Sequence, residues 1–287
     1  MTSTLAGVLP ALITPLTAEG HVNVEVLEQL LDRLYAADVQ GVYVCGNTGE
    51  GMRCTLAMRK TVLETAVRCS PPGKLVIAHV GAERLDDAID LARHAGQHGA
   101  HALSSLPLGT EFESIYSYYS SLAAATKLPF LVYYFPEMAP GIRTMEEIRK
   151  LCELPNIAGL KFTDFDLYRM SMLTRDGLTI FNGRDEVFAA GLLMGACGGI
   201  GSFYNVAPEL FLETYRLARE HQFVEARHTQ DHINDLITIV LRFPMLPALK
   251  AMLEWRGLAC GPSLTARPLT TEEAGQLRSA LEQAGFQ

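Results

Sequence analysis

Short apolar runs alternate with longer amphipathic segments eight times between residues 7 and 220, and this alternation most restricts the fold of the chain. In residues 24–37, for example, Leu27, Leu30, Leu31 and Leu34 fall on one face of a helix. Eight strand–helix units in series predict an α/β fold in which a parallel sheet closes into a (β/α)8 TIM barrel, not an open doubly wound sheet. The expected strands are residues 7–14, 41–45, 74–80, 102–105, 130–134, 157–161, 178–182 and 198–202. The expected helices are residues 24–37, 55–69, 83–98, 113–126, 144–153, a short one from about Leu167, 186–194 and 208–220.

The sequence from residue 222 onward has a different pattern, which is helical throughout and is broken by Pro244, Pro247 and Gly257. We therefore expect two parts, a barrel in residues 1–221 and a C-terminal helical region in residues 222–287 that packs on the barrel. A chain of 287 residues suits this arrangement, because barrels of this size are commonly single domains.

The bulk properties argue against several classes of partner. A net charge of −8 argues against nucleic acid and anionic membranes, although a small anionic substrate remains compatible with it. No apolar stretch reaches membrane-spanning length, and residues 1–7 show no basic leader followed by an apolar core. The six cysteines are scattered without a C-x-x-C spacing, which is typical of reduced thiols. We expect a cytoplasmic protein.

Polar residues gather where the expected strands end, which is the rim at which barrel enzymes carry their chemistry. The clusters are Gly46-Asn47-Thr48-Gly49-Glu50, Tyr133-Tyr134, Lys161, Asn182-Gly183-Arg184-Asp185-Glu186 and Ser202. Each cluster alone is weak evidence, but their convergence on one rim predicts an active site there.

Lys161 ends a short apolar run, so it is expected at the polar end of a buried strand. Burial disfavours the ammonium form and lowers the pKa of a lysine. A neutral amine is what a carbonyl substrate needs to form a Schiff base. The alternative is a solvated or salt-bridged lysine.

The other strand-end residues each allow a functional and a structural interpretation. The 46–50 loop could hold a carboxylate with its backbone N–H groups and the Thr48 hydroxyl, or it could be a plain turn in which Glu50 ties the loop down. Tyr133 could relay protons, or be a core aromatic residue with a satisfied hydroxyl. Tyr134 points to the opposite face of the strand and is expected to pack.

Two further clusters are equally open. Asp185 and Glu186 could bind sugar hydroxyls, or they could be an acidic start to a helix. The glycines in residues 198–202 resemble a barrel phosphate site in composition, and they equally suit a tight strand that makes room for its neighbours.

The histidines invite a metal interpretation, because His94 and His98 are one helical turn apart and His101 follows closely. His94 and His98 lie on an expected outer helix, however, and the strand-end carboxylates do not complete a ligand set. We therefore expect no metal site. His79 lies within a strand and is expected to be a hydrogen-bonded core residue.

The ordered motifs resemble those of a known family. Gly-x-Thr-Gly-Glu, Tyr-x-x-Pro at residues 133–136, Gly-Leu-Lys at 159–161 and Gly-Gly-Ile-Gly-Ser at 198–202 are similar to those of the pyruvate-dependent class I aldolases. That superfamily groups N-acetylneuraminate lyase with dihydrodipicolinate synthase. The resemblance runs from Gly7 through the helical tail.

The resemblance implies a role for each motif. Lys161 would form the Schiff base with pyruvate, and Tyr133 would shuttle protons. Thr48, with Asn47 beside it, would hold the pyruvate carboxylate, and the Ile200 carbonyl would face the imine. No metal or organic cofactor is implied, because the iminium itself serves as the electron sink.

Within the superfamily the chain is more similar to the lyase branch. Thr163, Gly183, Asp185, Glu186 and Ser202 would then meet a polyhydroxyl substrate tail. The synthase branch carries an arginine soon after Tyr-x-x-Pro and a tyrosine after the fourth strand, and residues 137–141 and 107–109 provide neither.

The chain also departs from the lyase pattern. Asn47 replaces a hydroxyl residue, Arg184 stands where an aromatic or aliphatic residue is usual, and Glu137 begins an unusual loop. The loop around Gly109 is shortened.

The resemblance thus implies a homotetrameric carbon–carbon lyase that cleaves a 2-oxo sugar acid, such as N-acetylneuraminate, to pyruvate and an aldehyde. One alternative is dihydrodipicolinate synthase (4-hydroxy-tetrahydrodipicolinate synthase) or another pyruvate-dependent aldolase or dehydratase acting on a 2-oxo acid. A non-enzymatic alternative is a silent sensor of 2-oxo acids.

Overall fold

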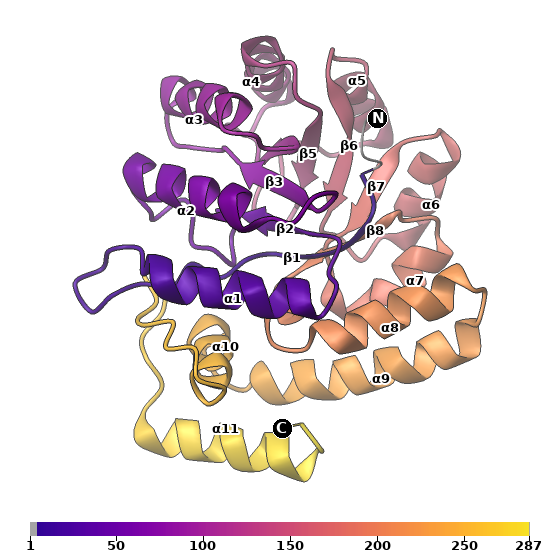
Figure 1. Cartoon of the computed structure of the whole chain (residues 1–287). Coiled ribbons are helices and arrows are strands. Elements are labelled where there is room, and N and C mark those ends of the chain that lie inside the picture. The colour runs from indigo at the N-terminus through magenta and orange to yellow at the C-terminus, as the bar shows by residue number, and fades with distance from the viewer. Residues whose placement is uncertain (1–4, 287) are drawn as a thin grey trace.

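A computed structural model describes residues 5–286 and shows a barrel of eight parallel strands (Figure 1). Neighbouring strands pair in chain order from β2 to β8, and β8 pairs with β1. Between β1 and β2 the barrel closes through a bridge from Ala11 to Tyr43, where the Leu12 N–H donates to the Tyr43 carbonyl at 2.8 Å. The predicted (β/α)8 barrel is therefore confirmed. The strands are β1 (Gly7–Pro10), β2 (Gly41–Val44), β3 (Leu75–His79), β4 (Ala102–Ser105), β5 (Phe130–Tyr134), β6 (Ile157–Phe162), β7 (Thr179–Asn182) and β8 (Gly198–Gly201).

The helices between the strands form the outer ring of the barrel (Figure 1). They are α1 (Val24–Ala36), α2 (Leu56–Cys69), α3 (Leu85–Gln97), α4 (Phe112–Ala125), α5 (Met145–Cys152), α6 (Leu167–Arg175), α7 (Phe188–Leu193) and α8 (Pro208–Arg219). Side chains fix several of their starts: Asn23, Thr55 and Thr144 each accept a hydrogen bond from a backbone N–H of the first turn. The predicted helix 186–194 is instead a 3₁₀ turn, Asp185–Val187, followed by α7.

The predicted strand at residues 7–14 is too long, since β1 ends at Pro10. The strand ends early because the Ile13 N–H donates to the side chain of Asn205 at 3.1 Å, and not to the backbone carbonyl of a neighbouring strand. Asn205 is buried, and its Nδ2 also donates to the Ala11 carbonyl at 2.7 Å. The Asn205 side chain therefore takes the place of the strand-to-strand hydrogen bonds where β1 leaves the sheet.

The alternation of side chains along each strand separates two cores. One core fills the barrel interior and includes Leu9, Tyr43, Phe181 and Ile200. The other lies between the sheet and the helices and includes Tyr134. The expectation that Tyr134 packs away from the barrel interior is thus confirmed.

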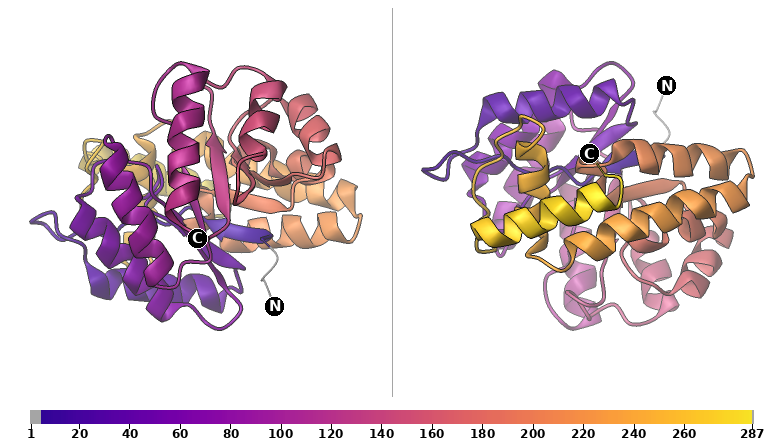
Figure 2. Two further views of the ribbon diagram at one scale, coloured as in Figure 1. Left: turned by 90° about the horizontal axis from the view of Figure 1, so that it is seen from above. Right: turned by 90° about the horizontal axis from the view of Figure 1, so that it is seen from below.

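The C-terminal helices α9 (Phe223–Val240), α10 (Met245–Glu254) and α11 (Thr271–Gln283) lie together beside α8 and α1 (Figures 1 and 2). Pro247 does not break a helix as predicted, because it lies in the first turn of α10, where backbone N–H groups have no helical partner. The prediction of helix throughout is wrong for residues 255–270, where the chain is irregular. Gly257, with a φ of 87°, follows the end of α10.

The division at residue 222 stays a prediction, as does the absence of a leader, which rests partly on residues 1–4, outside the described residues. Within residues 5–286 no single helix is long and apolar enough to cross a membrane. The consecutive helices α9 and α10 reach that length and composition only together, with a bend of 106° between them.

Candidate active site

All ten predicted site residues line one cavity of about 420 Å³ at the C-terminal ends of the strands. A second cavity, of about 390 Å³, lies at α10 and α11 and contains none of them. The strand-end rule therefore placed these residues correctly, while their chemical roles stay predictions. The ten are Asn47 and Thr48 after β2, Tyr133 on β5, Lys161 and Thr163 on and after β6, Gly183, Asp185 and Glu186 after β7, and Ile200 and Ser202 on and after β8.

Lys161 is buried between two aromatic rings. Its Nζ lies 4.2 Å from the ring centroid of Tyr133 and 4.4 Å from that of Tyr43. No ion pair to Lys161 is found among the described side chains. Burial lowers the pKa of Lys161 to about 7, although the Asp185 carboxylate opposes this shift. A substantial fraction of the amine is therefore neutral, and nucleophilic, at neutral pH.

Tyr133 provides a phenol beside this amine. Burial raises the pKa of Tyr133, while the Thr163 hydroxyl and the Arg184 guanidinium oppose the rise. The phenol is therefore protonated at neutral pH, and Thr163 and Arg184 are placed to stabilise a transient phenolate. This arrangement suits a group that gives up a proton and takes it back.

Asp185 is a buried carboxyl group beside the lysine. Its Oδ2 accepts a hydrogen bond from the Phe203 N–H at 2.9 Å. Burial raises the pKa of Asp185 to about 7, and Glu186 adds to the rise. Because Asp185 and Lys161 influence each other, their protonation is linked near neutral pH.

The glycines of β8 make room for these neighbours. A Cβ atom on Gly201 would lie 1.8 Å from the Asp185 Oδ1, and one on Gly199 would lie 2.2 Å from the Tyr204 hydroxyl. Of the two interpretations of this segment, the structure therefore favours a tight strand over a phosphate-binding loop.

The loop after β2 faces the same cavity. Thr48 and Ser202 share a hydrogen bond of 2.7 Å between their hydroxyl oxygens, which joins this loop to the end of β8. The loop is flanked by two non-glycine residues in the left-handed region, Cys45 at a φ of 58° and Glu50 at a φ of 53°. Such strain persists only where the surroundings fix the backbone, and it is common at functional sites.

Glu50 provides that fixation. Its Oε1 accepts hydrogen bonds from the Ser263 hydroxyl at 2.6 Å, the Leu264 N–H at 2.7 Å, and the Thr265 N–H and hydroxyl at 2.9 and 2.8 Å. The Lys250 Nζ lies 3.4 Å from its Oε2. Burial raises the pKa of Glu50, but these partners outweigh it and the net pKa is lowered. The interpretation of Glu50 as a structural carboxylate is confirmed, and it fixes Thr265 at the cavity wall.

Several cavity residues were not predicted as site residues. Some are adjacent to the recognised motifs and could have been found by extending them. Met245, Leu246 and Thr265 come from the C-terminal region, and no local pattern marks them. The unpredicted residues are Phe135, Met138, Arg184, Gly201, Phe203, Met245, Leu246 and Thr265.

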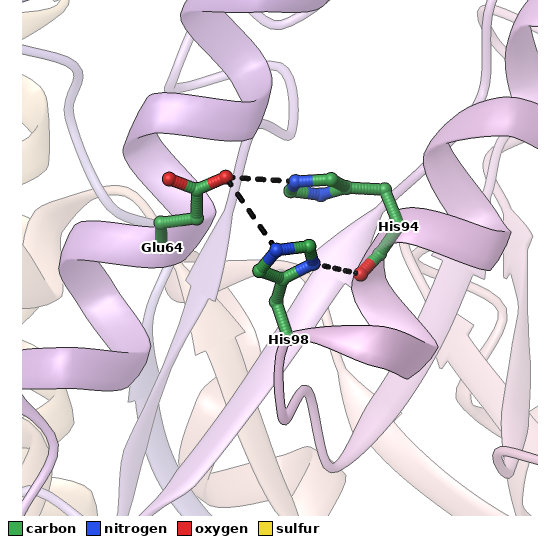
Figure 3. Close-up of side chains that lie close together, drawn as sticks. All are labelled: Glu64, His94 and His98. Atoms are coloured by element: carbon green, nitrogen blue, oxygen red, sulfur yellow. Dashed lines mark hydrogen bonds and ion pairs between the residues drawn. The ribbon is translucent and has the colours of Figure 1, made fainter.

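The histidine cluster lies on the outer helices, apart from this cavity. Figure 3 shows Glu64 of α2 facing His94 and His98 near the end of α3. The His94 Nε2 lies 2.8 Å from the Glu64 Oε1, and the His98 Nδ1 lies 2.8 Å from the His94 carbonyl. These side chains could hold a metal ion if the Glu64–His94 contact opened, and none of them lines the cavity. Sequence reasoning missed Glu64 because it sought carboxylates only at strand ends.

The remaining histidines have other roles. The His101 Nδ1 accepts a hydrogen bond from the Val76 N–H at 3.1 Å. The buried His79 accepts at Nε2 from the Leu106 N–H at 3.0 Å, which confirms that it is a hydrogen-bonded core residue.

Comparisons with known proteins agree on one family. The model of the dihydrodipicolinate synthetase family matches residues 4–284. The N-acetylneuraminate lyase of Rhizobium meliloti is 33% identical over 283 residues, which cover 97% of this chain and 94% of that protein. A catalytic lysine mutant of the Ruminococcus gnavus sialic acid aldolase superimposes with a TM-score of 0.93 at 28% identity, covering 98% of this chain and 95% of that one. The Clostridium difficile protein CdNal, solved in complex with mannosamine, gives a TM-score of 0.92 at 26% identity, covering 98% and 99%.

Proposed function

The chain belongs to the dihydrodipicolinate synthetase family, and from this membership we propose that it is a Schiff-base lyase that cleaves N-acetylneuraminate, or a related 2-oxo sugar acid, to pyruvate and an aldehyde. The observation that carries the proposal is the buried amine of Lys161, whose pKa is lowered to about 7 inside the strand-end cavity. The names of the relatives, N-acetylneuraminate lyase and sialic acid aldolase, support the substrate class. One of the structural relatives is itself a catalytic lysine mutant, which supports a lysine as the reactive group.

The proposed first chemical step uses the buried amine of Lys161. Its neutral Nζ attacks the C2 carbonyl of the substrate, and the resulting carbinolamine loses water to give an iminium ion. The departing hydroxide takes the proton of the Tyr133 phenol. Thr163 and Arg184, which oppose the rise in the Tyr133 pKa, stabilise the phenolate that remains. The Thr48 hydroxyl, with Asn47 beside it, holds the substrate carboxylate.

In the cleavage step the Tyr133 phenolate becomes protonated again. The Tyr133 phenolate takes the proton of the C4 hydroxyl, the C3–C4 bond breaks, and its electron pair moves into the iminium to form an enamine. The aldehyde leaves, and the enamine carbon takes a proton from Tyr133. Water hydrolyses the imine, releasing pyruvate and the free Lys161 amine. Asp185 and Glu186 bind hydroxyl groups of the aldehyde half.

A single trapping experiment tests this scheme. The protein is incubated with N-acetylneuraminate as sole ligand, reduced with borohydride and mapped by mass spectrometry, with pyruvate in a parallel sample. A pyruvyl adduct on Lys161 in both samples supports binding, imine formation and cleavage together. An adduct from pyruvate alone would keep the aldolase chemistry and exclude this sugar. No adduct in either sample would overturn the proposal.

Three further parts of the proposal concern the setting of the reaction. We propose that the enzyme needs no metal or organic cofactor, that it is a homotetramer and that it works in the cytoplasm. Light scattering on the purified protein measures its mass in solution, and activity that survives dialysis against a chelator would support the cofactor-free chemistry. A higher kcat/KM with aspartate semialdehyde than with 4-oxobutanoate, which differs from it only in lacking the amino group, would favour the synthase activity instead.

A further inference from the structure

Arg184 and Glu137, two of the departures from the lyase sequence pattern, meet in the structure. Arg184 follows β7 and lines the cavity, and Glu137 follows β5. Their side chains form an ion pair that connects these two loops. The two departures are therefore one structural feature at the edge of the site.

The pair is asymmetric. The side chain of Arg184 is 15% exposed and that of Glu137 is 62% exposed. The guanidinium carbon lies 4.4 Å from the ring centroid of Phe165 and 5.2 Å from that of Phe135. The Asn182 Nδ2 donates to the Arg184 carbonyl at 2.7 Å, which fixes the loop. The guanidinium is thus held without Glu137, and an ion pair with one partner in water contributes little.

Arg184 also has hydrogen-bonding capacity left over. Its Nε is buried and has no hydrogen-bond partner within residues 5–286, while its Nη2 contacts the exposed Glu137 carboxylate. No ion pair among the described residues joins Arg184 to Asp185 or Glu186, and Asp185 is held by the Phe203 N–H. Buried donors without acceptors are unfavourable, and the planar fork of a guanidinium matches a carboxylate.

We propose that Arg184 binds a carboxylate on the aldehyde half of the substrate, and that Glu137 occupies the guanidinium until this carboxylate displaces it. The inference rests on the proposed Schiff-base function and narrows its substrate class. The preferred substrates are 2-oxo acids with a second, terminal carboxylate, and acids with an uncharged polyhydroxyl tail react more slowly.

The test runs the reaction in the direction of synthesis, with saturating pyruvate and matched aldehydes. Each pair consists of an acid and its neutral amide, 4-oxobutanoate with 4-oxobutanamide and 6-oxohexanoate with 6-oxohexanamide, so that two lengths are sampled. We expect kcat/KM to favour the acid by about tenfold to a hundredfold at one length, the range for a hydrogen bond to a charged group.

Variants test whether Arg184 and Glu137 cause the preference for the acid over the amide. Arg184→Gln should remove it by raising the KM for the acid, and Arg184→Lys should keep part of it, because the charge stays while the fork is lost. Glu137→Gln should raise kcat/KM for the acid, since the competing carboxylate is gone. Arg227→Gln, which removes an exposed arginine of α9 outside the cavity, should keep the wild-type ratio.

Other results would overturn the inference. These are equal use of acid and amide at both lengths, a preference that survives Arg184→Gln, or a Glu137→Gln variant that uses the acid less well. If pyruvate is trapped on Lys161 while no preference exists, the inference fails and the lyase function stands. If pyruvate is not trapped, the function fails and the inference falls with it.

Discussion

Two buried lysines of this molecule have different partners, and we propose different purposes for them. Lys161 and Lys250 are each 4% exposed. The Lys250 Nζ donates to the Pro262 carbonyl at 2.5 Å and pairs with Glu50, whereas the nearest groups to the Lys161 Nζ include two aromatic rings. Burial lowers the pKa of both, and a paired carboxylate opposes this at Lys250. Partners, not burial, thus separate the structural ammonium of Lys250 from the amine that we propose to be reactive.

Removing the reactive amine should have the largest effect. Lys161→Ala should lower turnover by a factor on the order of 10⁴–10⁶, as expected when a nucleophile is lost. The fold should be at least as stable, because a buried amine without an ion pair is gone. Steady-state assays and thermal unfolding measure the two effects. Lys127→Ala, at an exposed lysine, is the matched control, and normal turnover in Lys161→Ala would refute the Schiff-base assignment.

Removing the hydroxyl of Tyr133, the proposed proton carrier, should have the second largest effect. Tyr133→Phe should lower kcat by about 10²–10⁴, the usual contribution of a general acid–base group, with less effect on pyruvate binding. The adjacent Tyr134 offers a control, because its hydroxyl contacts Asp164 and Arg169 outside the barrel interior. Tyr134→Phe should retain turnover. If the two variants behave alike, Tyr133 is a packing residue.

This contrast also shows what the sequence could predict. The position of the candidate site was predictable because a barrel places its chemistry at strand ends, and the alternation of Tyr133 and Tyr134 assigns their faces. The partners of Lys250 were not predictable, because Pro262 and residues 263–265 lie in a stretch where the pattern suggested helix. For the same reason, Thr265 was not predicted as a residue of the site. The ion pair of Arg184 and Glu137 joins loops far apart in sequence, and no local pattern connects them.

Removing the structural ammonium should affect stability rather than chemistry. Lys250→Met leaves Glu50 as a buried carboxylate without its cation, and breaking such a pair costs about 3–5 kcal/mol of unfolding free energy. Urea unfolding at neutral pH measures the loss. The double variant Glu50→Gln/Lys250→Met removes both charges and should recover part of it. A single variant as stable as the wild type would show that the hydrogen bonds from residues 263–265 hold Glu50 without Lys250.

The smallest effect, a pH dependence, should separate the two lysines without any mutation. Below pH 7 the Lys161 amine is increasingly protonated, so kcat/KM should fall about tenfold for each pH unit that the pH is lowered. Above pH 7 kcat/KM should reach a plateau. Asp185 has a pKa that is also about 7, so the fall in kcat/KM reports the linked protonation of Lys161 and Asp185 together. Asp185→Asn should move this fall to lower pH, because the Asp185 carboxylate is the interaction that raises the Lys161 pKa.

The fold should respond in a different pH range. The folded pKa of Glu50 is lowered from 4.5, so its contribution to stability is present above pH 4.5 and is lost only as the pH falls through the lowered value. For Lys161 the sign is the same but the window is higher, because its folded pKa is lowered from 10.5 to about 7: the penalty for burying its charge is full below about pH 7 and disappears as the pH rises from there toward 10.5. At pH 5 the protein should therefore remain folded by circular dichroism while its kcat/KM is about a hundredfold below the plateau. Loss of fold and of activity at the same pH would mean that both lysines are structural.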